Sequence, residues 1–279
     1  MNLQFEDIRE DTLILLIIRA IETKRQNARV RDRKALEILE TLDIDTKGLD
    51  RAILHECVIA RTVLFDSAVK EAVGREPKAV CVNLDCGLDN RFVRVDNGWI
   101  QWYNVDTGEQ IEVRKKAFSG SRREKTAACN FSDRGWTDQL PKDLPVIIIA
   151  EDLLPHYTRE QIKSFLDEIT GAFPKGVLIA ELARRKTKKR NAPDDAESKA
   201  PWGFVYSGKD LTLLDESGRM SFVKETTFTE QMKKDGLKAQ ICGLLAGIMN
   251  NRVSVFEWKK AAENEKENTS DEQKEGENI

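Results

Sequence analysis

The alternation of short apolar runs with helical segments in the second part of the chain constrains its fold most strongly. Helical patterns at 108–118 and 159–173 separate several of these runs. The strand-like runs cover residues 79–84, 99–105, 126–131, 146–150, 177–182, 220–224 and 253–258. This alternation predicts an α/β fold with a seven-stranded, mostly parallel sheet and helices on both faces. The last two runs, separated by one helical stretch at 229–249, are expected at the far edge, where a strand can run in reverse.

The domain organisation follows from what surrounds these runs. Helical patterns at 11–24, 33–42 and 49–73 precede the first strand, so residues 1–76 are expected to form an N-terminal helical cap on a core of 77–260. Residues 183–200 carry a basic run beside an acidic one, which is typical of a mobile, solvated loop and less so of a docking site. Residues 261–279 are almost wholly polar and are expected to be a disordered tail.

Composition and charge exclude several classes of function. The net charge of −3 provides no basic field for nucleic acid. Five cysteines without C-x-x-C spacing are typical of reduced thiols in a cytoplasmic protein, and two histidines argue against a histidine-rich metal site. The apolar run at 13–18 is too short to span a membrane, and the acidic start lacks the basic region of a signal peptide.

A glycine-bearing turn follows the first strand-like run. Gly87 lies between Asp85 and Asp89, and a single glycine does not make the G-x-G-x-x-G fingerprint of dinucleotide-binding proteins. The next run ends on Asp106, about 20 residues past the turn, where open α/β sheets place the acid that holds ribose hydroxyls. A strand–turn–helix without any ligand explains the turn equally well.

Acidic residues recur at the ends of the expected strands. Asp133 and Glu151 each follow an apolar run, as Asp106 does. The carboxyl ends of parallel strands meet at one edge of a sheet, where α/β proteins bind their ligands. An acidic edge suits hydroxyls, amines and cations better than phosphates, which favours S-adenosylmethionine over a nucleoside triphosphate or NAD.

Two arginines lie in helical stretches that are apolar on most sides. Arg19 is embedded in L-I-L-L-I-I-R-A-I, and Arg61 shares a helical face with Cys57 and Leu64. A buried guanidinium needs a carboxylate, which comes either from the protein or from a ligand. A structural ion pair is modestly favoured, and for Arg61 its candidate partners are Asp66 and Glu56.

Four blocks of sequence resemble the leucine carboxyl methyltransferase superfamily, which also contains polyketide O-methyltransferases of the tetracenomycin type. They are A-R-T-V-L-F-D at 60–66, V-N-L-D-C-G-L-D-N-R at 82–91, W-Y-N-V-D-T-G-E-Q-I-E-V-R-K at 102–115 and I-A-E-D-L-L-P-H-Y at 149–157. The resemblance covers about residues 10–258 and implies a Rossmann-like fold that binds S-adenosylmethionine.

The resemblance also implies roles for individual residues. Arg61 takes the position that holds the methionine carboxylate of the cofactor, and Arg19 is similar to a second basic residue near it. The remaining positions implied are Gly87 against the cofactor, Asp106 on the ribose, Asp133 at the adenine and Glu151 lining the pocket. Asp85 and Asp152 depart from the pattern, because the family usually has glycine there. A carboxylate at 85 either crowds the cofactor or favours its amine and sulfonium charges.

The resemblance implies methyl transfer from S-adenosylmethionine to a carboxylate or hydroxyl oxygen of a small-molecule or peptide acceptor. The basic run at 184–190 favours an anionic acceptor. A carboxylate acceptor needs no general base, whereas a hydroxyl would be helped by one. His156 is the candidate base and Tyr157 the candidate for orienting the acceptor, although a histidine without a catalytic role is somewhat favoured.

Three other hypotheses remain open at this point. A catalytically degenerate cofactor-binding or regulatory homologue is motivated by Asp85 and Asp152. A nucleotide-dependent oxidoreductase is disfavoured by the single glycine and the acidic strand ends. A protein-interaction module would use the basic run and the polar tail.

Overall fold

The computed structural model describes residues 3–44, 46, 50–129, 135–182, 208–245 and 251–260. Its elements, in chain order, are η1 (Phe5–Asp7), α1 (Glu10–Thr23), α2 (Arg33–Thr41), α3 (Ala52–Arg75), β1 (Val80–Leu84), α4 (Arg91–Val95), β2 (Gln101–Asp106), α5 (Gly108–Ala117), β3 (Glu124–Ala128), η2 (Trp136–Gln139), β4 (Val146–Ala150), η3 (Leu154–His156), α6 (Arg159–Ala172), β5 (Lys175–Leu182), α7 (Gly208–Thr212), β6 (Met220–Thr227), α8 (Phe228–Lys234), α9 (Leu237–Leu245) and β7 (Arg252–Lys259).

The expected seven-stranded, mostly parallel sheet is confirmed. Its strand order is β3-β2-β1-β4-β5-β7-β6, with β1 to β5 parallel and β7 antiparallel to both of its neighbours. Leu84 is in register with Val105 of β2 and with Ala150 of β4, and Ala150 is in register with Ala180 of β5. The carboxyl ends of these four strands therefore lie nearly level along one edge of the sheet.

Several expected element boundaries differ from the structure by one to three residues, and two differences have a clear physical reason. The third strand begins at Glu124, before the predicted 126–131. The prediction missed this start because the strand is only partly buried and its apolar pattern is therefore weak. The expected helix at 229–249 is divided into α8 and α9 around Gly236, whose φ of 105° interrupts helical geometry. Residues 130–134 and 246–250 lie outside the described residues.

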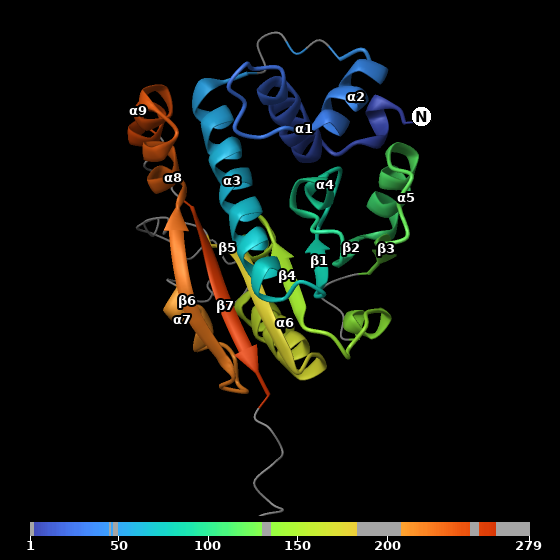
Figure 1. Ribbon diagram of the computed structural model, residues 1–279, viewed down its shortest axis with the longest axis vertical. Coiled ribbons are helices and arrows are strands. Elements are labelled where there is room, and N and C mark those ends of the chain that lie inside the picture. The colour runs from blue at the N-terminus through green and yellow to red at the C-terminus, as the bar shows by residue number, and fades with distance from the viewer. Residues whose placement is uncertain are drawn as a thin grey trace, which may run out of the picture.

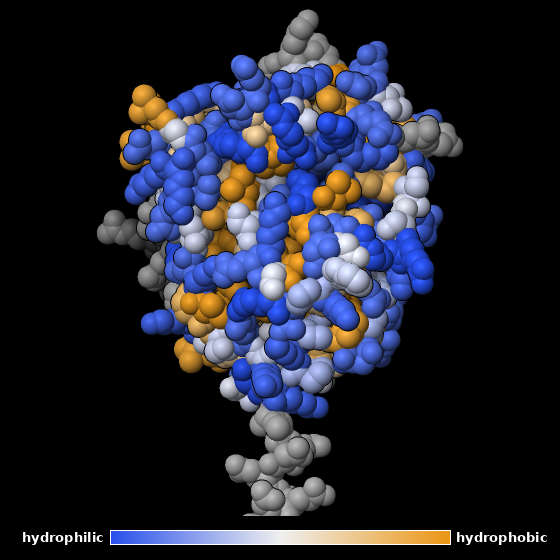
Figure 2. All heavy atoms as spheres, in the orientation of Figure 1, coloured by the Kyte–Doolittle hydropathy of each residue, from blue (hydrophilic) through white to orange (hydrophobic). Residues whose placement is uncertain are grey.

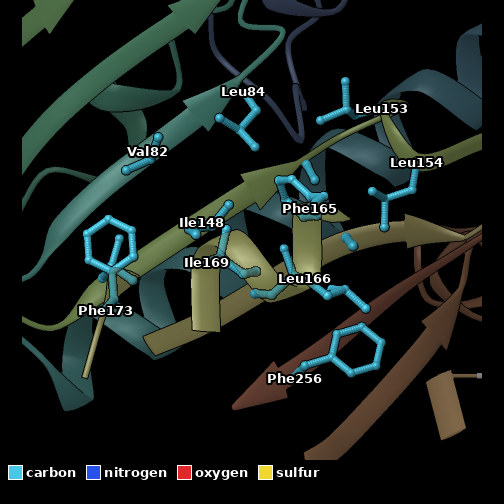
Figure 3. Packing of buried hydrophobic residues seen from close by; sticks show 14 of the residues in the cluster. Val82, Leu84, Ile148, Leu153, Leu154, Phe165, Leu166, Ile169, Phe173 and Phe256 are labelled. Atoms are coloured by element: carbon cyan, nitrogen blue, oxygen red, sulfur yellow. The ribbon is translucent and has the colours of Figure 1, made fainter. Parts of the chain in front are cut away.

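The sheet is buried on both faces, which explains why its central strands are continuous apolar runs. All five residues of β1 and of β4 are buried. On one face, Val82 and Ile148 lie in a cluster with Phe165 and Leu166 of α6 (Figure 3). On the opposite face, the intervening residues pack against α3, which crosses the front of the sheet in Figure 1. Each large apolar side chain buried in this way stabilises the fold by about 1.5–3 kcal/mol.

The N-terminal helices α1 and α2 cover the carboxyl edge of the sheet. Figure 1 shows α1 and α2 beyond the tips of the central strands. Leu13 and Leu16 of α1 pack with Ile38 of α2, and the same cluster contains Leu88 from the turn after β1. The cap therefore contacts the turn that the sequence singled out.

The exposed surface is mostly hydrophilic in the view of Figure 2. Hydrophobic atoms are visible at upper left, where Figure 1 places α9, whose Leu237, Ile241 and Leu244 are exposed. Within the described part of the chain, no helix is both long and apolar enough to cross a membrane.

Candidate functional site

The turn after β1 has a left-handed backbone at two of its first three residues. Asp85 has φ 50° and Gly87 has φ 44°. A glycine adopts this conformation without strain, whereas in other residues the side chain crowds the backbone. A Cβ added at Gly87 would lie 3.2 Å from the Thr12 side chain of α1, so the cap closes tightly over this point. Both the backbone conformation and the available space therefore favour glycine at this position.

Asp106 is hydrogen-bonded to the backbone of the glycine turn. It ends β2, is fully buried, and accepts hydrogen bonds from the backbone N–H groups of Gly87 at 2.9 Å and Thr107 at 2.8 Å. Burial raises the pKa of the Asp106 carboxyl to about 6, and the negative charge of Asp85 adds to the rise. The structure thus holds the expected ribose acid against the glycine turn.

Arg9 is a residue that the sequence analysis missed. It directly precedes α1, and its Nη2 donates to Oδ1 of Asp85 at 3.1 Å. The ion pair fastens the start of the cap to the left-handed turn. No local pattern marks this arginine, because its partner lies 76 residues further along the chain.

Arg61 lies on α3 and reaches the ends of β4 and β5. Its Nε lies 2.9 Å from Oε1 of Glu151, and its Nη1 lies 3.4 Å from Asp152 and 3.4 Å from Glu181. Asp152, like Asp85, has a left-handed backbone, with φ 52°. Both positions are ones where the sequence carries aspartate in place of the glycine expected from the resemblance.

Arg61 has the structural ion pair that was favoured from sequence, but the partners given for it were wrong. Asp66 accepts hydrogen bonds from Arg91 at 2.8 Å and Arg94 at 2.6 Å, and Glu56 accepts one from Arg29 at 2.6 Å. These carboxylates are close to Arg61 in sequence but lie on other sides of α3. Arg61 instead pairs with acids from the distant strand ends.

Glu181 is a second residue that the sequence analysis missed. It lies near the end of β5, is buried, and accepts a hydrogen bond from Asn251 Nδ2 at 2.6 Å. Burial raises its pKa to about 7, against the opposite effect of Arg61. The signal was available, since Glu181 follows the apolar run at 177–180 as Glu151 follows its own.

Arg19 and Arg91 complete the basic groups of the site. Arg19 is buried, with its Nε 3.0 Å from Oδ2 of Asp32, so it has the structural partner that was favoured from sequence. Arg91 donates to Glu151 at 2.5 Å and therefore shares this acid with Arg61.

A cavity of about 90 Å³ lies between the cap and the carboxyl edge of the sheet. Its floor is formed by residues 83–89, which include the glycine turn. Its charged lining consists of Arg9, Arg19, Arg61 and Arg91 together with Asp11, Asp85, Asp89, Glu151 and Asp152. The described lining therefore holds slightly more acid than base, and it brings together most of the residues expected from the sequence.

The candidate catalytic residues differ in position. His156 lines the cavity, with a side chain that is 69% exposed and an Nε2 3.7 Å from Oδ1 of Asp152. Tyr157 is partly buried against the core on the α6 side of the sheet. Asp133 and the basic run at 184–190 lie outside the described residues. Among those that are described, no cluster of three or more histidine, cysteine or acidic side chains could hold a metal ion.

Comparison with known proteins settles the family. The profile of the leucine carboxyl methyltransferase family matches residues 5–170, more than half of the chain. The chain belongs to this family. It is 24% identical over 180 residues to the tetracenomycin polyketide synthesis O-methyltransferase TcmP of Streptomyces glaucescens, a match that covers 64% of this chain and 67% of TcmP.

Two further relatives extend the comparison. The chain is 25% identical over 182 residues to the S-adenosyl-L-methionine-dependent methyltransferase dpfgK of Gibberella zeae, covering 59% of this chain and 61% of that protein. Its fold is similar to the solved structure of a proposed methyltransferase from Thermobifida fusca YX, with a TM-score of 0.52 and 11% identity. That match covers 89% of this chain and 95% of the other.

This member of the leucine carboxyl methyltransferase family is a methyltransferase whose cofactor is S-adenosylmethionine. The donor set at the carboxyl edge fits the groups of that cofactor. Guanidinium groups face the cavity for a carboxylate, and acidic groups face it for an amine, a sulfonium and hydroxyls. Gly87 and the other residues of its turn line the cavity at the strand ends, where α/β proteins bind their ligands.

Proposed function

We propose that this protein is an S-adenosylmethionine-dependent O-methyltransferase that acts on a carboxylate or hydroxyl of a small-molecule or peptide acceptor. The observation that carries the proposal is the meeting of Arg61, Glu151 and the glycine turn at one cavity, with Asp106 directly behind the turn. These groups come from four separate elements and converge at the edge where α/β proteins bind ligands.

In this proposal the two ends of the cofactor are held by residues from different elements of the fold. Arg61 holds the methionine carboxylate and Glu151 the amine, since the two side chains already lie 2.9 Å apart. Asp106 accepts the ribose hydroxyls, and Gly87 lets the cofactor approach the backbone. Arg19 adds positive charge near the carboxylate. The proposed contact of Asp133 with the adenine lies in a part of the chain that the structure does not describe.

Cofactor binding requires the cavity to widen. Its volume of about 90 Å³ is below the roughly 300 Å³ of sites for ligands of this size. The ion pair between Arg9 and Asp85 lies close enough to Asp106 for both of its charges to affect the pKa of that carboxyl. We expect this pair to separate when the cofactor reaches the ribose acid, while the carboxylate of Asp85 stays close to the positive charge of the cofactor.

For the methyl transfer itself, the main task of the protein is to align acceptor and cofactor in a site that excludes water. His156 is the candidate base for a hydroxyl acceptor, because it lines the cavity beside Asp152. Tyr157 is the weaker candidate for orienting the acceptor, since it packs against the core. A carboxylate acceptor is ionised at neutral pH and needs neither residue as a base.

Calorimetric titration with S-adenosylhomocysteine tests the cofactor site. Binding by the wild type that is lost in Arg61→Ala and in Asp106→Ala, but kept in the surface variant Lys163→Ala, supports the proposal. A screen of carboxylate and hydroxyl acceptors with radiolabelled S-adenosylmethionine then tests O-methyl transfer. Failure of the wild type to bind S-adenosylhomocysteine would refute the proposed site.

A catalytically degenerate homologue is the alternative that one observation favours. Asp85 replaces the glycine expected from the resemblance, and its side chain pairs with Arg9 at the cavity, where a glycine would leave open space. This alternative predicts that the protein binds S-adenosylhomocysteine without transferring methyl to any acceptor, and that Asp85→Gly strengthens the binding. A methylated product from the wild type would exclude it.

A further inference from the structure

Three carboxylates surround the single guanidinium of Arg61. Glu151 lies 2.9 Å away, and Asp152 and Glu181 each lie 3.4 Å away. Arg91 shares Glu151, but it also faces Asp66 and Asp89. The positive charge at this point is therefore outnumbered before any ligand binds.

Glu181 is the most enclosed of these three acids. Its side chain is 1% exposed, whereas those of Glu151 and Asp152 are 16% and 50% exposed. One of its oxygens accepts from Asn251 at 2.6 Å, and the other accepts from the backbone N–H of Asp152 at 3.2 Å. These two bonds fix the carboxyl against Arg61.

The charged and titratable groups that face Glu181 come from two elements besides its own strand. Arg61 and Cys57 lie on α3, and Glu151 and Asp152 follow β4. Within the described chain, Arg61 is the positively charged member of this set. A further anion brought to Arg61 would leave Glu181 in contact with a neutralised guanidinium and a like charge.

We propose that Glu181 is a positioning residue for the carboxylate of the cofactor and takes up one proton from solvent when the cofactor binds. This inference rests on the proposed role of Arg61 as the carboxylate-binding residue. The neutral carboxyl keeps an oxygen to accept from Asn251, and its new O–H can donate to the incoming carboxylate. Arg61 then needs no displacement from the strand ends to accept the cofactor.

The electrostatics of the free protein support this assignment. Burial raises the pKa of Glu181 to about 7, so the carboxyl is already close to protonation at neutral pH. A second carboxylate on Arg61 raises the pKa further, because like charge disfavours the ionised form. Glutamine at this position imitates the neutral carboxyl, whereas alanine removes it.

The test is calorimetric titration of the wild-type protein with S-adenosylhomocysteine in two buffers of different ionisation enthalpy, which reports the protons taken up. At about pH 8 the wild type should take up close to one proton more than Glu181→Gln, and its Kd should weaken about 50-fold between pH 7 and pH 9 by linkage. Glu181→Gln should keep the binding and lose this extra dependence. The amine of the ligand titrates alike in both proteins and cancels in the comparison.

Two further variants separate positioning from folding. Glu181→Ala should bind weakly at every pH, because Arg61 and Asn251 then both lose their contact with the Glu181 carboxyl. Glu225→Gln, a matched change on β6, should behave as the wild type. Equal proton uptake in the wild type and Glu181→Gln, or no uptake by a wild type that binds, would overturn this inference alone. A wild type that fails to bind would overturn it together with the proposed function.

Discussion

Asp106→Asn is expected to make the stability of the protein less dependent on pH. The Asp106 carboxyl is fully buried, and its pKa is raised from 3.8 to about 6 by burial and then by Asp85. The folded protein therefore holds this proton more tightly than the unfolded chain, and ionisation destabilises the fold. The destabilisation is absent below pH 3.8, grows as the pH rises, and is complete above about pH 6. A shift of this size corresponds to about 3 kcal/mol.

Urea denaturation of the wild type and the variant at about pH 4 and pH 8 measures this effect. The asparagine amide must face one of the two backbone N–H groups that Asp106 now binds, which costs about 1–3 kcal/mol. This cost is the same at both pH values and cancels. The variant should therefore gain about 2.5 kcal/mol relative to the wild type between pH 4 and pH 8. A difference between the two proteins that does not change with pH would refute the raised pKa.

Three further substitutions test the turn and the core. Arg9→Ala removes a partly exposed ion pair with Asp85, so the free energy of unfolding should change by less than about 1 kcal/mol. Calorimetry should show about five-fold tighter binding of S-adenosylhomocysteine. Weaker binding would contradict the expected opening of the turn. Gly87→Ala forces a side chain into a left-handed backbone beside Thr12 and should cost about 1–2 kcal/mol in thermal denaturation, unlike alanine at an unconstrained surface glycine. Phe165→Ala empties a fully buried position and should cost about 3–5 kcal/mol in chemical denaturation, so a loss under about 1 kcal/mol would show that the core is loosely packed.

The parts of the fold that were predictable from sequence are those that leave a pattern in a few consecutive residues. A strand buried on both faces is a continuous apolar run, so β1 and β4 could be located within a residue or two. Asp106 and Glu151 were singled out for the same reason, because each follows such a run directly, and Gly87 because it lies in the turn after one. The start of β3 was missed because an edge strand with partial burial has no comparable pattern.

The ion pairs of the site could not be predicted in the same way. Helical periodicity predicts which residues share a face of the helix, but not which distant carboxylate will contact that face. Arg61 therefore received two sequence neighbours as partners, whereas its actual partners lie 90 to 120 residues away. Arg9 and Asp85 are 76 residues apart. Such contacts follow from the strand order, which periodicity alone does not determine.

Helix α3 has a consequence for how the protein unfolds. Its Ile59 packs with Ile18 of the cap, whereas its Phe65 and Val69 belong to the core against the sheet. A single rigid helix that is shared between two hydrophobic clusters makes the loss of one weaken the other. The N-terminal helices α1 and α2 and the sheet should therefore melt in one cooperative transition, with the calorimetric enthalpy equal to the van't Hoff enthalpy.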